Sequence, residues 1–319
     1  MAAAEETEAH RQPLAGRIWS QPYVLLILTT LGWGGNAVAS RMAVGQISPM
    51  TLTFARWGLV LLLLLVSFRG QIARGLPALK RQWIAVLLMG ASGFTIFNAL
   101  NYVAAHYTSA VNLSITQGTV PLLVLLGGLI VHRAPVRRRQ IAGALLALLG
   151  VAMVASGGHL DALMKLRFNV GDVMMFTAAV IYSGYTVALR DRGDGGGAGQ
   201  IAFFFGMAVA AFLTSIPLLA IEVATGGFHA PTPKGLAILT FIALVPSFVS
   251  ALFFMRAVAL IGPARAGLFF NLVPVFGALL AVLILGEPLG LHQVLALTMV
   301  LGGIAVAERK GKAPAGPAA

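Results

Sequence analysis

Ten stretches of about 20 predominantly apolar residues follow one another along this chain of 319 residues. An α-helix of that length crosses the hydrocarbon core of a bilayer and satisfies its own backbone hydrogen bonds there. Only 10% of the residues are charged, whereas a soluble protein has about a quarter. The sequence therefore predicts an all-α integral membrane protein with ten transmembrane helices. The expected spans are Tyr23–Ala43, Met50–Phe68, Trp83–Ala105, Ser109–Val131, Gln140–Ser156, Gly171–Leu189, Gln200–Ile221, Leu236–Arg256, Arg265–Leu285 and Leu291–Ala307.

The positive charges favour one orientation of these helices. If the N-terminus is cytoplasmic, 17 of the 22 Lys and Arg residues lie in cytoplasmic segments, four lie outside and Arg56 lies within a span. Such a bias predicts that both termini are cytoplasmic, in a multi-pass protein of the cell inner (plasma) membrane. The net charge of +12 comes from short basic runs between apolar stretches, which fit contacts with anionic lipid rather than nucleic acid.

The chain contains an internal repeat. Residues 121–150 align without gaps with residues 274–303, and the matches include Pro135 with Pro288 and Gln140 with Gln293. Chance similarity between apolar helices is the alternative. Because each unit has five spans, an odd number, the second unit has the opposite orientation to the first, as in many secondary transporters. The expected organisation is a polar tail (1–22), a first repeat (23–156), a connecting loop (157–169), a second repeat (170–307) and a basic, Pro/Ala-rich tail (308–319).

Several short motifs occur in a specific order. They are Trp33-Gly34-Gly35-Asn36, Pro49 with Arg56, Thr108-Ser109-Ala110 before Pro121, Gly262-Pro263-Ala264-Arg265-Ala266 before Pro274, and Gly286-Glu287-Pro288. Together they resemble the drug/metabolite transporter (DMT) superfamily, in its EamA-type branch, and are most similar to YddG-type amino-acid exporters. The resemblance covers about Tyr23 to Ala307. It implies a central cavity shared by the two halves and export of amino acids, aromatic ones included.

One departure from the internal symmetry concerns an acidic residue. The first repeat has His132-Arg133-Ala134-Pro135 where the second has Leu285-Gly286-Glu287-Pro288. The sequence therefore gives Glu287 no coupling role shared by the two halves.

No catalytic signature occurs in the chain. It has no Cys, and its six His residues lack metal-ligand spacing. We therefore expect no enzyme activity, no metal and no cofactor. Carboxylates are scarce away from the tails, and a proton relay normally requires buried ionisable groups. This favours facilitated diffusion or exchange, with proton coupling through His106 as an open alternative.

Polar residues on apolar helices identify candidate sites. An amide facing lipid would leave its donors unmet, so these side chains should point inward. They either line a substrate cavity or form hydrogen bonds between helices, each worth about 1 kcal/mol. Arg56 would attract a substrate carboxylate, or would snorkel or bond to packed carbonyl groups. The candidate cavity residues are Trp33, Asn36, Arg56, Asn98, Asn101, Tyr102, Asn112, Thr116, Tyr182, Tyr185, Ser250 and Asn271.

Two prolines occupy matching places inside the fourth and ninth spans. Pro121 and Pro274 each remove a backbone hydrogen bond and can kink a helix. They form static kinks or a pair of symmetric gates.

The sequence thus predicts a secondary transporter that exports amino acids or related small metabolites by alternating access. Its expected partners are a small-molecule substrate and the lipid bilayer. The oligomeric state is open, and a monomer is compatible with the sequence. The alternatives are transport of another metabolite class (a nucleoside, sugar derivative or drug-like cation) and a non-transporting membrane scaffold or receptor.

Overall fold

The computed structural model describes residues 18–133, 138–159, 168–190 and 195–308, and every element in these ranges is helical. The first half contains α3 (Pro22–Ala43), α4 (Pro49–Arg81), α5 (Trp83–Gly90), η1 (Ala91–Ile96), α6 (Phe97–Ala104), α7 (Ala110–Gln117), α8 (Val120–His132) and α9 (Arg138–Ala155). The second half contains α11 (Val170–Arg190), α12 (Gln200–Ala224), α13 (Pro233–Ile242), η2 (Ala243–Val249), α14 (Ser250–Ile261), α15 (Pro263–Gly267), η3 (Leu268–Leu272), α16 (Val273–Leu285) and α17 (Leu291–Glu308).

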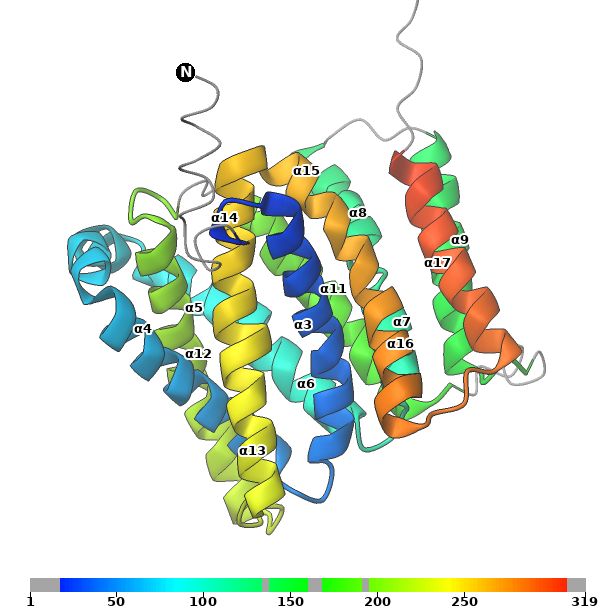
Figure 1. Cartoon of the computed structure of the whole chain (residues 1–319), viewed down its shortest axis with the longest axis horizontal. Coiled ribbons are helices and arrows are strands. Elements are labelled where there is room, and N and C mark those ends of the chain that lie inside the picture. Colours follow the sequence, from blue (N-terminus) through cyan, green and yellow to red (C-terminus); the bar gives the residue numbers. More distant parts are fainter. Residues whose placement is uncertain (1–17, 134–137, 160–167, 191–194, 309–319) are drawn as a thin grey trace, which may run out of the picture.

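The helices form one bundle in which consecutive spans run up and down in alternation (Figure 1). Within the described ranges, nine helical stretches are long and apolar enough to cross a membrane. The tenth expected span, Leu291–Ala307, is a shorter apolar helix. We call the end of the bundle where α3 begins and α17 ends the near face, and the opposite end the distal face.

The largest difference from the predicted spans concerns the second one. It was expected to end at Phe68, but α4 continues to Arg81. Phe68 has φ −135° and ψ 23°, so the chain kinks there and resumes a helix. The apolar pattern stops at this point because Arg69 begins a polar segment, whereas a helical backbone can continue through polar residues at a membrane surface.

The two halves share their irregularities, which supports the internal repeat. The third span contains the π-helix η1, and the eighth contains the π-helix η2 at the matching place. The helices α8 and α16 each end at a residue in the left-handed conformation, Arg133 with φ 50° and Gly286 with φ 65°. These positions differ by the same 153 residues as the aligned prolines, so the correspondence extends to the backbone.

The two halves enter the bundle from opposite faces. The first helix of the first half, α3, begins at the near face, whereas α11 begins at the distal face (Figure 1). Asn169, directly before α11, donates a hydrogen bond of 2.9 Å to the carbonyl of Tyr107 in the distal link between α6 and α7. The geometry of the halves is therefore inverted, as an odd number of crossings requires.

Small residues allow some helices to approach closely. A Cβ atom on Gly34 of α3 would lie 2.7 Å from the backbone nitrogen of Gly277 in α16. A Cβ atom on Gly277 would lie 2.2 Å from the hydroxyl oxygen of Ser114 in α7. Gly143 of α9 and Gly303 of α17 approach each other in the same way. Small residues at such crossings are typical of membrane helix packing.

Candidate functional site

A buried arginine and three neutral side chains form the centre of the candidate site. Arg56 of α4 donates from Nε to Ser247 Oγ (2.7 Å) and from Nη1 to Asn98 Oδ1 (2.6 Å). Nη1 also donates to the hydroxyl of Tyr102. The sequence predicted Arg56, Asn98 and Tyr102 as candidates, and the structure brings them together. Arg56 is buried and does not reach the surface, and within the described residues its hydrogen bonds go to side chains and not to backbone carbonyls.

Both π-helices hold the partners of Arg56 in place. Ser247 belongs to η2, and its hydroxyl donates to the carbonyl of Ile242. Asn98 lies just after η1, and its amide group donates to the carbonyl of Phe94 within η1. Ser247 and Asn98 therefore each donate a hydrogen bond to a backbone carbonyl, and each presents a side-chain oxygen to Arg56. Single-turn π segments in α-helices are frequently found at functional sites.

The positive charge of Arg56 has no carboxylate partner among the described residues. The side chain is 6% exposed, and its guanidinium carbon lies 5.1 Å from the centre of the Trp57 ring. A buried charge in a membrane protein costs at least a few kcal/mol unless it is paired. Hydrogen bonds and an aromatic ring stabilise it in part, but they do not neutralise it. The site is therefore electropositive.

The polar face of α3 lies beside this centre. Trp33 Nε1 donates to the carbonyl of Pro246 (3.0 Å), the residue before Ser247. Two turns further along α3, Ser40 accepts a hydrogen bond of 2.9 Å from Asn101, one turn after Asn98. Asn36 lies between these two contacts on the same helical face. It is 8% exposed, and its Oδ1 has no hydrogen-bond partner in the described part of the chain.

Aromatic rings continue from the arginine toward α11. The ring of Trp57 stacks on Phe94 with centroids 4.5 Å apart, and Phe94 contacts Tyr185 at 5.9 Å. Tyr182 contacts both Tyr185 (5.3 Å) and Phe97 (4.8 Å). The two tyrosines named from the sequence thus belong to an aromatic cluster that adjoins the arginine site.

Other predicted residues lie elsewhere. Asn112 is part of a polar network at the distal face, where it donates to Asp172 Oδ2 (3.2 Å) and accepts from Gln293 (2.9 Å). Thr116 and Asn271 each have a buried oxygen without a partner among the described residues. Ser250 is buried, and its backbone carbonyl accepts a bond from Thr29. None of the recorded hydrogen bonds joins these residues to Arg56.

The two prolines begin helices rather than interrupting them. Pro121 and Pro274 occupy the first turns of α8 and α16. A missing N–H costs nothing there, because the first N–H groups of a helix have no partner within it. The fourth span is interrupted at residues 118–119, and the ninth changes from the 3-10 helix η3 to α16 at Val273, so each proline lies inside its span at the start of a new helical segment.

Two acidic residues were not among the predicted site residues, yet each joins the two halves at the distal face. Glu222 accepts from the backbone amides of Met50 (2.9 Å) and Thr51 (3.0 Å) at the start of α4. Glu287 accepts from those of Ala110 and Val111 at the start of α7, both at 3.0 Å. The one sequence feature that could have pointed to these contacts is that carboxylates are scarce away from the tails, so each remaining one is a candidate for a specific role.

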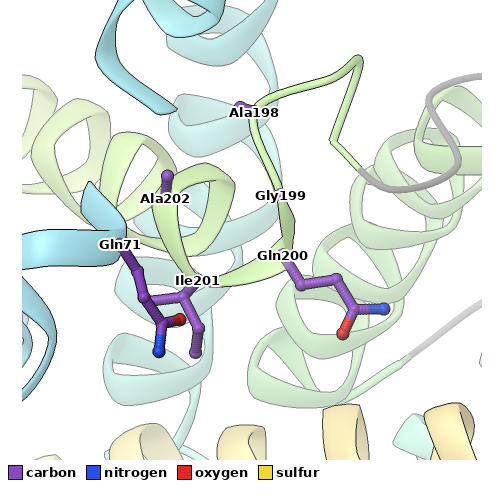
Figure 2. Close-up of a pocket in the computed structure, with 6 residues that line it drawn as sticks. All are labelled: Gln71, Ala198, Gly199, Gln200, Ile201 and Ala202. Atoms are coloured by element: carbon purple, nitrogen blue, oxygen red, sulfur yellow. The ribbon is translucent and has the colours of Figure 1, made fainter. Parts of the chain in front are cut away.

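A separate hollow lies at the near face, away from Arg56. Its volume is about 280 Å³, and Figure 2 shows Gln71 of α4 beside the first turn of α12. The lining residues are Gln71, Ala198, Gly199, Gln200, Ile201 and Ala202. No group of three His, Cys, Asp or Glu side chains that could hold a metal ion occurs in the described ranges.

His106 lies outside the spans, in the distal link between α6 and α7. Partial burial lowers its pKa below the ordinary value of 6.5, and the nearby positive charges of Arg41 and His229 lower the pKa further. Glu222 acts in the opposite direction. The lowered pKa favours the uncharged form of the imidazole.

Comparison with known proteins gives consistent matches. Residues 21–156 and 169–308 each match the EamA-like transporter family. The "Uncharacterized transporter YyaM" of Bacillus subtilis (strain 168) is 26% identical over 90% of this chain and 93% of its own length. An "Uncharacterized transporter" of Archaeoglobus fulgidus is 27% identical over 84% of this chain and 90% of its own.

A crystal structure with 20% sequence identity covers 91% of this chain and 98% of its own, with a TM-score of 0.62. This likeness supports the fold alone. The two family matches correspond to the two halves of the helical bundle, which explains the shared π-helices and left-handed caps. The chain therefore belongs to the EamA-like transporter family and is a multi-pass membrane transporter.

Proposed function

We propose that this protein is a secondary transporter that exports amino acids, aromatic ones included, across the inner membrane by alternating access. In this proposal the near face is cytoplasmic. The observation that carries it is the buried charge of Arg56, which has only neutral partners in the described residues. A ligand that brings a carboxylate would supply the missing negative charge.

The guanidinium group has N–H donors that remain available to such a ligand. Its bonds to Ser247, Asn98 and Tyr102 use only Nε and Nη1, and no described residue accepts a bond from Nη2. Arginine binds carboxylates through directed N–H groups, and these charge-assisted bonds are among the stronger ones in proteins. A drug-like cation would be repelled here, and a neutral nucleoside or sugar derivative would leave the charge unpaired.

The position of Asn36 favours a zwitterionic substrate over a simple anion. Its Oδ1 is a buried acceptor without a partner in the described residues, on the face of α3 beside Asn101 and Pro246. An ammonium group has three donors and no acceptor, so it complements this oxygen. The carboxylate of an amino acid would contact Arg56, its ammonium group Asn36, and an aromatic side chain the cluster of Tyr182 and Tyr185.

The same residues favour facilitated diffusion or exchange over proton coupling. No carboxylate of the described residues belongs to the Arg56 centre, and His106 lies at the distal face rather than beside it. A proton relay through the membrane normally uses buried ionisable groups that exchange protons with one another.

Flux and binding in reconstituted liposomes test this function. We expect saturable transport of phenylalanine or another amino acid. Arg56→Gln should weaken binding of phenylalanine and of 3-phenylpropanoate, which lacks the ammonium group, by about 10- to 100-fold. Binding of phenethylamine, which lacks the carboxylate, should not weaken. Saturable flux of a nucleoside, sugar derivative or cation, without amino-acid flux, would make the proposal wrong, and no flux of any candidate would favour a scaffold.

A second variant separates the two charges of the ligand. Asn36→Leu should weaken phenylalanine binding by about tenfold and leave 3-phenylpropanoate binding unchanged, since only phenylalanine has the ammonium group. Thr30→Val is the matched control, because Thr30 is buried on the same helix and bonds to Leu26 within it. Equal losses for both ligands would show that Asn36 has a structural role only.

A further inference from the structure

At the distal face, two carboxylates bind equivalent helix starts. The two oxygens of each carboxylate accept hydrogen bonds from two consecutive backbone amides. Glu222 extends from the end of α12 to α4, and Glu287 extends from the end of α16 to α7. The hydroxyl of Thr51 adds a third bond to Glu222, at 3.0 Å. The amides at a helix start lack partners within the helix, and the helix dipole favours a negative charge there.

Both contacts connect a helix of the first half with its equivalent in the second half. In the internal repeat, the second span matches the seventh, and the fourth matches the ninth. If both faces were alike, matching contacts would join the same pairs at the near face. The start of α12 would then bind an acidic side chain from α4, and the start of the ninth span would bind one from the region after α8.

The near face lacks these carboxylates. The part of α4 that corresponds to Glu222 spans residues 69–73 and contains Gln71 but no acidic residue. At the start of α12, where the equivalent contact would form, the structure has the hollow of about 280 Å³ beside Gln71 (Figure 2). The counterpart of Glu287 is Ala134, which has no charge. Within the described residues, the two faces of the inverted repeat therefore differ by two charged contacts.

We propose that Glu222 and Glu287 are latches that hold the distal face closed, so that the resting transporter is open toward the near face. A substrate leaving at the distal face requires both latches to separate. This inference rests on the transporter fold and is independent of the substrate. In this proposal Glu287 and Glu222 have the same role at two different helix starts. The alignment of the two repeats does not reveal this equivalence.

Labelling of single cysteines in purified protein tests the latches, since the natural chain has no Cys. Thr53→Cys reports on the distal face, because Thr53 is buried one turn after the start of α4. Ile201→Cys reports on the near-face hollow. In a background of Glu222→Gln and Glu287→Gln, maleimide should label Thr53→Cys about tenfold faster and Ile201→Cys more slowly, because closing one face accompanies opening of the other.

Opposite changes at the two positions separate a latch from a merely stabilising contact. A loosened fold would raise both labelling rates, and that result would overturn the proposal, as would unchanged rates. Thr225→Val serves as the matched control, because Thr225 is exposed near Glu222 and bonds only within α12. With Thr225→Val added, Thr53→Cys and Ile201→Cys should each be labelled at the same rate as without it.

A second variant keeps the proposal testable if the double substitution does not fold. Gln71→Glu places a carboxylate beside the start of α12, where the near face lacks one. It should slow labelling of Ile201→Cys and accelerate labelling of Thr53→Cys. No change at either position would contradict the proposed difference between the faces. Neither readout requires a substrate, so a failure here is distinguishable from a failure of the amino-acid proposal.

Discussion

At the scale of single residues, Arg56 illustrates how a membrane protein keeps a charge in its interior. Ser247 and Asn98 accept its hydrogen bonds while donating their own to backbone carbonyls. Because each partner is fixed by the backbone, the arginine is oriented before any ligand binds. Such preorganisation reduces the entropy that binding must overcome.

His106 gives a prediction about pH at this scale. Its pKa is lower in the folded protein than the ordinary 6.5. Between the two pKa values the unfolded chain therefore binds a proton that the folded protein does not, and stability falls as the pH drops below 6.5. We expect His106→Gln to reduce the loss of thermal stability between about pH 7.5 and about pH 5.5. Identical losses in the variant and the natural protein would show that other groups cause the acid sensitivity.

At the scale of elements, the apolar pattern predicted the helices well because lipid excludes charged residues along each span. It did not predict the π-helices. A π segment inserts one residue into the helix and turns all later side chains, so the period of 3.6 no longer gives the inward face. Ser247 and Ser250 are both polar residues of the eighth span, and it is Ser247, within η2, that bonds to Arg56. The sequence pattern likewise placed Asn112 in the cavity, because it cannot distinguish a central position from one at a helix end.

The breaks before Pro121 and Pro274 lead to a second prediction. Both prolines lie in the first turn of a helix, where alanine is tolerated, so Pro121→Ala and Pro274→Ala should each change thermal stability by less than about 1 kcal/mol. If the breaks act as gates, each variant should retain ligand binding and transport more slowly. The measurement is binding and flux on the same liposome preparations. Unchanged transport in both variants would identify the breaks as static.

At the scale of the whole molecule, the inverted repeat determines which positions share a face. The odd number of spans in each repeat predicts opposite orientations of the halves. The structure places Tyr107 and Thr225 at the distal face and Gln71 and Gln200 at the near face (Figure 1). All four side chains are exposed. The contacts between the halves could not be predicted, because the apolar pattern of a helix does not identify the helix it packs against.

Labelling in intact cells tests this arrangement. The test uses four single-cysteine variants, in which Tyr107, Thr225, Gln71 or Gln200 is replaced by Cys. We expect an impermeant maleimide to label the first two in intact cells and the last two only after permeabilisation, since the positive charges favour a cytoplasmic near face. The reverse pattern would invert the orientation. Labelling of Tyr107 and Thr225 from different sides would exclude the inverted repeat.

The close approach of Gly34 to Gly277 has a mechanical consequence. Where α3 meets α16, the backbones of Gly34 and Gly277 approach closely because neither residue has a side chain. Such a contact resists compression but offers little friction to a change in crossing angle. It can therefore act as a fulcrum, about which the helices tilt while their midpoints stay together. A larger side chain at position 34 would wedge the helices apart and remove the pivot.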